Sequence, residues 1–122
     1  MGEMLPIITE IKTREEFVGF LARNPGQFII KFGAEWCGPC KKMSDLFHSW
    51  VEKMPNNVQV AILDVDESFE IYAYLKSKKM VNGVPVILCY QKGNLNFIPD
   101  DVVIGADHGQ INLFFQRCLS KL

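Results

Sequence analysis

The sequence predicts an α/β protein with a central mixed β-sheet, mostly parallel, that is flanked by helices on both faces. Three observations lead to this prediction. Strand-like segments alternate with segments of helical periodicity along the chain. Residues 27–34 and 58–65 are nearly continuous in apolar residues, which is typical of strands buried on both faces. Residues 92–94, with Gly93 at their centre, predict a hairpin turn that adds an antiparallel edge strand.

The first half of the chain is divided by capping and turn signals. Residues 7–11 are short and apolar and predict a strand. Thr13 with Glu16 three residues later is a capping-box pattern, which predicts a helix that ends at the turn residues 24–26. After the strand 27–34, a helix begins near residue 37, with Pro39 in its first turn, where a missing N–H costs nothing.

The second half repeats the alternation and then changes to a hairpin. Pro99 interrupts the segment that follows the hairpin turn, so we expect at best an interrupted edge strand there. The predicted elements are strand 58–65, helix 68–80, strand 84–91, edge strand 95–105 and a final helix from 108.

Length and composition favour one globular domain over residues 1–122. Apolar residues make up 48% and charged residues 22% of the 122 residues, close to average values. A net charge of −1 gives no basic surface for nucleic acid or an anionic membrane. Residues 1–11 lack a signal-peptide pattern and the myristoylation motif, and no apolar stretch is long enough for a membrane span. We therefore expect a cytoplasmic protein.

Cys37 and Cys40 form a CxxC motif between a predicted strand and a predicted helix. The helix start places Cys37 where backbone N–H groups and the helix dipole stabilise a thiolate, the nucleophilic form of cysteine. Cys40 lies one turn further along, close enough for a disulfide with Cys37, and we expect it to be the more buried of the two. This arrangement favours thiol–disulfide exchange.

Two other uses of the cysteine pair are less favoured. A zinc site needs about four ligands, but Cys89 and Cys118 do not form a second pair, and His48 and His108 are isolated. A structural disulfide across two residues closes too small a loop to stabilise the fold much. We therefore favour a redox pair with no metal and no cofactor, and we expect Cys89 and Cys118 to be small buried hydrophobic residues.

The chain resembles the thioredoxin family over about residues 7–120. The sequence AEWCGPCK (34–41) is similar to the family's active-site signature. VDES (65–68) is similar to the segment after the central strand, GVPVIL (83–88) to the strand that begins with a cis-proline, and VIGA (103–106) to the glycine segment before the last helix. The resemblance implies the thioredoxin fold.

The resemblance also implies roles for single residues. Cys37 would attack a substrate disulfide, and Cys40 would resolve the mixed disulfide. Pro85 would follow a cis peptide bond and face the active site. The residues expected to line a shallow groove for substrate proteins are Trp36, Gly38, Pro39, Val84, Pro85, Gly105 and Ala106.

By this resemblance the protein is expected to be a protein-disulfide oxidoreductase that works in cell redox homeostasis and electron transport. Its partners would be protein disulfide substrates and an NADPH-dependent thioredoxin reductase. The alternative is a thioredoxin-like subunit of a larger assembly, such as a dynein light chain or a particle component. The acidic segment 94–103, longer than is usual in the family, could protrude and contact such a partner.

Lys31 departs from the family pattern. The family usually carries a buried aspartate at this position, paired with a lysine from the next strand, whose counterpart here is Ile62. We expect Lys31 to lie beneath the active-site helix and to modulate the thiols: as a cation it would lower the pKa of Cys37, and as a neutral amine it could serve as the base for Cys40. Alternatively, it extends its ammonium group to solvent. Glu35, Asp64 or water would then have to replace the missing acid.

Overall fold

The computed structural model describes residues 5–122, which contain four helices and four strands. The elements are α1 (Arg14–Ala22), β1 (Gln27–Gly33), α2 (Gly38–Lys53), β2 (Val58–Asp64), α3 (Phe69–Ser77), β3 (Val86–Gln91), β4 (Asp101–Ile104) and α4 (His108–Ser120). The predictions about a leader or a lipid anchor depend on residues 1–4, which lie outside the described range. No helix in residues 5–122 combines the length and the apolar character that crossing a membrane requires.

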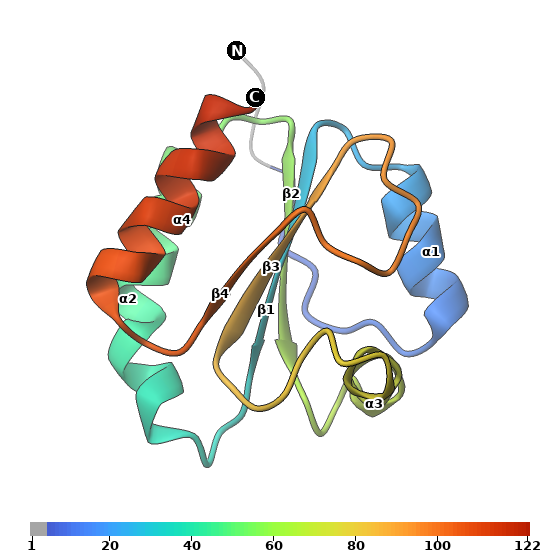
Figure 1. Ribbon diagram of the computed structural model, residues 1–122, viewed down its shortest axis with the longest axis horizontal. Coiled ribbons are helices and arrows are strands. Elements are labelled where there is room, and N and C mark those ends of the chain that lie inside the picture. The colour runs from blue at the N-terminus through green and yellow to red at the C-terminus, as the bar shows by residue number, and fades with distance from the viewer. Residues whose placement is uncertain (1–4) are drawn as a thin grey trace.

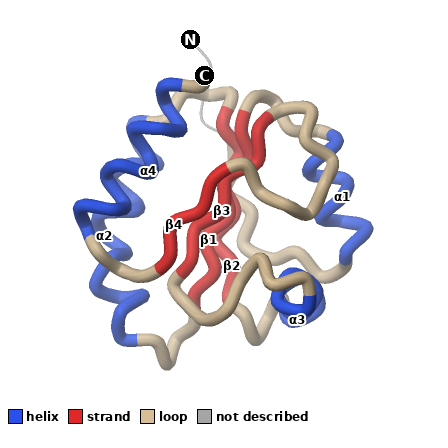
Figure 2. Tube along the Cα trace, in the orientation of Figure 1, coloured by secondary structure: helices blue, strands red, loops and turns tan. Residues whose placement is uncertain are grey.

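The four strands form one mixed sheet in the order β2-β1-β3-β4. Figure 1 shows α2 and α4 on one face of this sheet and α1 and α3 on the other. Figure 2 shows the same arrangement, with the strands in a central layer between the two pairs of helices. The mixed sheet with helices on both faces is therefore confirmed.

The sheet is less parallel than the sequence pattern indicated. β1 pairs with β2 in parallel, but β3 runs antiparallel to β1, and β4 runs antiparallel to β3, so the detail of a mostly parallel sheet is corrected. The physical reason is the direction of α3. Figure 1 shows this helix end-on, whereas the strands lie roughly in the plane of the picture. Because α3 does not run back along the sheet, the chain re-enters the sheet at the same end at which β1 and β2 finish, and β3 therefore runs in the opposite direction to β1.

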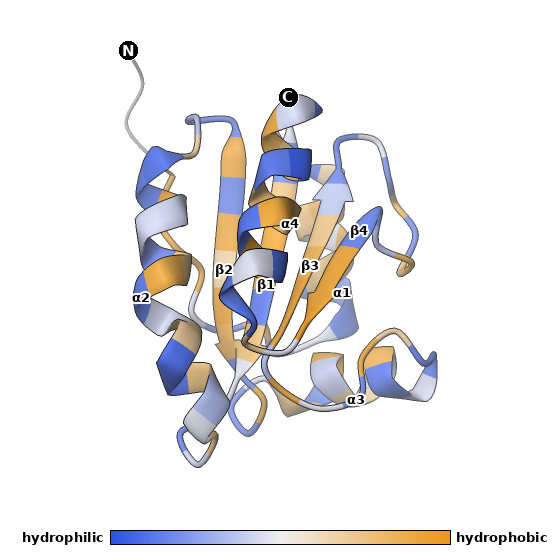
Figure 3. Ribbon diagram, turned by 60° about the vertical axis from the view of Figure 1, so that its left-hand side comes forward, coloured by the Kyte–Doolittle hydropathy of each residue, from blue (hydrophilic) through white to orange (hydrophobic). Residues whose placement is uncertain are grey.

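β1 is the centre of the core. Its side chains alternate between the faces, so Phe28, Ile30 and Phe32 pack on the side of α1 and α3. Ile29 lies on the opposite face, in the cluster formed with α2 and α4, and Lys31 points to that same face. Figure 3 shows the strands as largely apolar, while the helices carry polar residues as well.

Residues 7–11 do not form the strand that was predicted. Ile8 makes a single parallel bridge with Ala61 beside β2. Beyond this bridge the segment leaves the sheet, because the backbone N–H of Ile11 donates to Ser68 Oγ (3.1 Å) and that of Lys12 donates to Glu16 Oε1 (2.9 Å). The predicted capping box at Thr13 is confirmed.

The segment after β3 is mostly a loop, and the edge strand is confined to the four residues of β4. The loop does not form a free acidic protrusion. Asp100 Oδ2 accepts the backbone N–H of Gln91 (2.7 Å), and Asp101 forms an ion pair with Arg117 (2.8 Å). The loop also packs inward, because Tyr90 Oη donates to the carbonyl oxygen of Phe97 (2.7 Å).

Ser68 joins the N-terminal segment to the start of α3, and its removal is expected to destabilise the fold. Ser68 is buried, so Ser68→Ala leaves the buried N–H of Ile11 without an acceptor. We expect a loss of about 1–3 kcal/mol in the free energy of unfolding, measured by urea denaturation. Ser77→Ala is the matched control, because its hydroxyl is exposed, and it should change stability by less than about 0.5 kcal/mol. Equal stabilities of the two variants would contradict a structural role for the Ser68 hydroxyl.

Candidate active site

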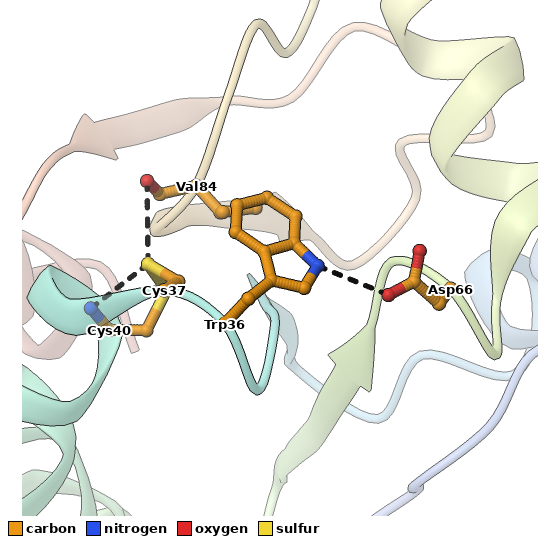
Figure 4. The surroundings of a disulfide bond; sticks show 5 residues. All are labelled: Trp36, Cys37, Cys40, Asp66 and Val84. Carbon is orange, nitrogen blue, oxygen red and sulfur yellow. Dashed lines mark hydrogen bonds between the residues drawn. A yellow bond between two sulfur atoms is a disulfide. The ribbon is translucent and has the colours of Figure 1, made fainter.

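The CxxC motif forms the start of α2. β1 ends at Gly33, and after a short loop Cys37 is the N-cap residue of α2, with extended backbone angles. Cys40 lies in the first turn, and the two cysteines form a disulfide with a Cα–Cα distance of 5.3 Å. The disulfide is drawn in Figure 4. The sequence-predicted pair is therefore brought together at the carboxyl end of the central strand.

The environment of Cys37 Sγ combines one donor and one carbonyl group. The backbone N–H of Cys40 donates to Cys37 Sγ over 3.1 Å. On the other side, the carbonyl oxygen of Val84 lies 3.8 Å from the same sulfur (Figure 4). The two cysteines are equally buried, each 5% exposed, so the expectation that Cys40 is the more buried was wrong for the disulfide form. The tight two-residue turn covers both sulfurs alike.

The segment opposite the disulfide begins β3. The Val84–Pro85 peptide bond is cis, as the resemblance implied. The carbonyl oxygen of Pro85 accepts the backbone N–H of Gly105 over 2.9 Å, which joins this segment to the end of β4. Gly105 has a φ of +90°, a conformation that residues with a Cβ rarely adopt, so the chain turns into α4 at a glycine. Ala106 then packs into the core beside α2 and α4.

Trp36 is a large, exposed side chain directly before Cys37 in the sequence. It is 70% exposed, and its indole Nε1–H donates to Asp66 Oδ2 over 3.2 Å (Figure 4). Gly38 and Pro39 are exposed as well. The predicted groove residues therefore lie on three segments: the loop before α2 with its first turn, the residues just before β3, and the residues just after β4.

Two residues at this edge were missed by sequence reasoning. Asp66 follows the end of β2, which runs parallel to β1, so both strands deliver their carboxyl ends to the same edge. The sequence signal that could have identified Asp66 is an aspartate just beyond the carboxyl end of a strand that is parallel to β1. Ile104, the last residue of β4, is 71% exposed and precedes Gly105. No signal in the sequence distinguishes Ile104 from the buried Val103 next to it.

Lys31 lies beneath the active-site helix, as expected, and is only 6% exposed. It pairs in register with Ile62 on β2, so the family's acid–base pair is replaced by a lysine beside an isoleucine. Its Nζ lies 5.2 Å from the centre of the Phe47 ring of α2. Burial lowers the pKa of Lys31 from its usual 10.5. Because Lys31 also lines an open pocket, the alternative that a buried stem carries its ammonium group to solvent is consistent with the structure.

Lys31 and Cys40 border one pocket of about 500 Å³ on the β2 side of the disulfide. Both expected substitutes for the missing acid, Glu35 and Asp64, line the same pocket. Asp64 is already engaged, since its Oδ1 accepts the backbone N–H groups of Asp66 (2.8 Å) and Glu67 (3.3 Å). Cys40 borders this pocket, whereas Cys37 does not.

The other two cysteines lie in the core between β3 and α4. Cys89 and Cys118 are both buried and free. The hydrogen bond with the Cys118 thiol, together with burial, raises the pKa of the Cys89 thiol. A thiol held in its neutral form is a poor nucleophile, so Cys89 is chemically quiet in the folded protein. Within residues 5–122, no three His, Cys, Asp or Glu side chains gather as metal ligands.

Comparisons with known proteins agree with this geometry. The family model described as Thioredoxin matches residues 8–116. A thioredoxin of Mycoplasma pneumoniae is 31% identical over 103 residues, which cover 80% of this chain and 95% of that protein. Thioredoxin 3 of Plasmodium falciparum is 29% identical over 84% of this chain, which spans only 54% of that relative.

A solved structure gives the same result. Oxidised mitochondrial thioredoxin 3 from Saccharomyces cerevisiae matches with a TM-score of 0.70 and 25% identity, covering 90% of this chain and 94% of that one. The findings do not favour the alternative of a subunit of a larger assembly. The disulfide at the start of α2, the family match and these relatives place the chain in the thioredoxin family of thiol–disulfide oxidoreductases.

Proposed function

We propose that residues 1–122 act as a single thioredoxin-like domain that reduces disulfides of substrate proteins. The observation that carries this proposal is the Cys37–Cys40 disulfide at the N-terminus of α2, beside an exposed tryptophan. Reduction of both sulfurs would provide two electrons for one substrate disulfide. The direct test is the reduction of insulin, coupled to an NADPH-dependent thioredoxin reductase.

Cys37 is the attacking thiol in this proposal. As the N-cap of α2, its sulfur meets the backbone N–H of Cys40 and the positive end of the helix dipole, both of which favour a thiolate. The thiolate attacks one sulfur of the substrate disulfide and forms a mixed disulfide. Cys40 then attacks Cys37 Sγ, which restores the protein disulfide and releases the second substrate sulfur as a thiolate.

The surface around Cys37 is proposed to dock the substrate chain. It combines exposed apolar side chains with backbone groups close to the sulfur, such as the Val84 carbonyl. Ile104 adds one exposed apolar side chain to the set predicted from the sequence. The proposed docking surface consists of Trp36, Gly38, Pro39, Val84, Pro85, Ile104, Gly105 and Ala106.

The oxidised protein has to be reduced again after each cycle. We propose a thioredoxin reductase that draws electrons from NADPH as the partner for this step, because the family generally works with such an enzyme. The protein would then act as an electron carrier in the cytoplasm. This recycling also makes the domain catalytic towards its substrate proteins.

Substitution of the two active-site cysteines should separate attack from resolution. Cys37→Ser removes the nucleophile and should abolish insulin reduction. Cys40→Ser leaves the attack intact but blocks release, so mixed disulfides with substrate should accumulate and be visible on non-reducing gels. Cys118→Ala, in the core away from the site, should keep most of the activity. Normal turnover by Cys40→Ser would contradict the assigned roles.

Mild alkylation should distinguish the four cysteines of the reduced, folded protein. We expect iodoacetamide near pH 7 to label Cys37 first, because its thiolate is favoured at the helix start. Cys89 and Cys118 are buried, and the raised pKa keeps the Cys89 thiol neutral until far more alkaline pH, so both should react only after unfolding. Peptide mapping gives the order of labelling. Early label on Cys89 or Cys118 would show that this assignment is wrong.

Trp36 should contribute to docking and not to the chemistry. Because buried aromatic anchors commonly cost more than about 1 kcal/mol when truncated, Trp36→Ala should weaken insulin reduction at least about fivefold, through KM. The rate with a small disulfide, such as cystine, should change by less than about twofold. Trp36→Phe should retain part of the effect, and Val18→Ala, on the exposed side of α1, is the matched control. Equal losses with both substrates would contradict a docking role.

A further inference from the structure

Lys31 is the feature of the active site that the thiol chemistry described above does not use. We propose that the Lys31 ammonium stabilises the thiolate of Cys40 and so favours the loss of the Cys40 proton to water. The inference deepens the proposed exchange reaction and rests on it. It also moves the effect of Lys31 from Cys37, where the sequence alone would put it, to the resolving cysteine.

The geometry directs Lys31 towards Cys40. Both residues approach Gly33, the last residue of β1: a Cβ placed on Gly33 would lie 3.6 Å from Cys40 Sγ and 3.9 Å from Lys31 Cε. The sulfur and Cε are therefore at most about 7.5 Å apart, and both residues border the same pocket. Cys37 Sγ instead faces the Val84 carbonyl on the docking side.

The charge of Lys31 is not neutralised by a neighbour. In the sheet its register partners are Ile62 on β2 and Ile87 on β3. Among residues 5–122, no carboxylate forms an ion pair with Lys31, and no acceptor is hydrogen-bonded to its Nζ. A partly desolvated charge without a counter-ion acts on nearby titratable groups more strongly than a paired or exposed one.

Two opposing influences set the protonation of Lys31. Burial lowers its pKa and favours the neutral amine. The face of the Phe47 ring, 5.2 Å from Nζ, favours the cation, and the pocket keeps the group in contact with solvent. The proposal requires the ammonium form at the pH where Cys40 loses its proton.

Other charged groups face the same pocket, and they partly offset one another. Glu35 precedes α2 and Lys41 lies on it. Asp64 is the last residue of β2, and Glu67 follows that strand. Glu35, Lys41 and Glu67 are exposed, so salt should screen their effect on Cys40. Lys31 is mostly buried, so 0.5 M salt should screen its effect on Cys40 less than it screens the effects of these exposed groups.

The step that benefits is the release of substrate. In the mixed disulfide, the Cys40 thiol gives its proton to water in the pocket, and the thiolate attacks Cys37 Sγ. The bond between Cys37 and the substrate sulfur breaks, the Cys37–Cys40 bond forms, and the substrate leaves as a thiolate that solvent protonates. The substrate disulfide gains two electrons, and the protein dithiol loses them. A cation near Cys40 raises the fraction of thiolate ready for this attack.

The test is the pKa of Cys40 in Cys37→Ser protein, in which residue 37 is neutral as it is in the mixed disulfide. The ¹³Cβ chemical shift of Cys40 reports its titration separately from Cys89 and Cys118. Lys31→Met removes the charge at similar volume and should raise the pKa of Cys40 by about half a unit or more, a threefold loss of thiolate below the pKa. In protein that keeps both Cys37 and Cys40, Lys31→Met should make the disulfide harder to reduce by glutathione. This effect should grow as the pH rises through the pKa of Cys40.

Two further variants identify the cause. Lys31→Arg keeps a charge that cannot be deprotonated and should leave the pKa of Cys40 close to its original value. Lys41→Met removes an exposed charge from the rim of the same pocket, and its smaller effect should disappear at 0.5 M salt. If Lys31→Met folds normally but changes the pKa of Cys40 by less than about 0.3, the proposal is wrong.

A measurement without any substitution of Lys31 gives an independent decision. The ¹³Cε shift of Lys31 in the Cys37→Ser protein shows directly whether the amine is protonated where Cys40 titrates. A neutral amine at that pH would overturn the proposal. These results are independent of insulin reduction. If the reductase assay fails but Lys31→Met still raises the pKa of Cys40, the proposed function is rejected and the inference about Lys31 is retained.

Discussion

The burial of β1 on both faces and its pairing on both edges is the constraint on which the rest of the structure depends. A strand held between β2 and β3 has no freedom to change register, because each one-residue slip would exchange Phe28, Ile30 and Phe32 for Ile29 and Lys31. The end of this strand therefore fixes where α2 begins. The position of Cys37 is set by the sheet, and its chemistry is set by the helix that follows.

Two sources of positive potential act on the sulfur pair from different directions. The N-terminus of α2 acts on Cys37 through the backbone N–H of Cys40, and Lys31 approaches Cys40 from below through the neighbourhood of Gly33. In the resembling family an acid, which is proposed to accept a proton, occupies the position of Lys31. The exchange of an acid for a base at one buried strand position reverses the sign of the charge that this position brings to the site.

Much of this site could be predicted from the sequence because its signals are local. The CxxC motif, the capping box at Thr13 and the apolar run of β1 each reflect interactions within a few residues. The direction of β3 could not be predicted, because alternation of strands and helices does not specify how α3 crosses the sheet. Ile104 and Asp66 were missed for a related reason: their positions beside the disulfide depend on strands that meet only in three dimensions. Residues 7–11 have the composition of a strand, but only Ile8 bridges to β2, and the N–H of Ile11 donates to Ser68 Oγ.

The antiparallel pairing of β3 with β1 separates the origins of reactivity and recognition. The two thiols lie within one turn of helix and stay near each other whenever that segment is folded. The Val84–Pro85 segment reaches them only because the chain reverses after α3, and so it meets Cys37 from 47 residues away in the sequence. An opening motion that detaches β3 would leave a competent dithiol without a surface to select its partner. For the proposed docking surface, selectivity is thus a property of the assembled sheet, whereas the dithiol belongs to a short stretch of chain.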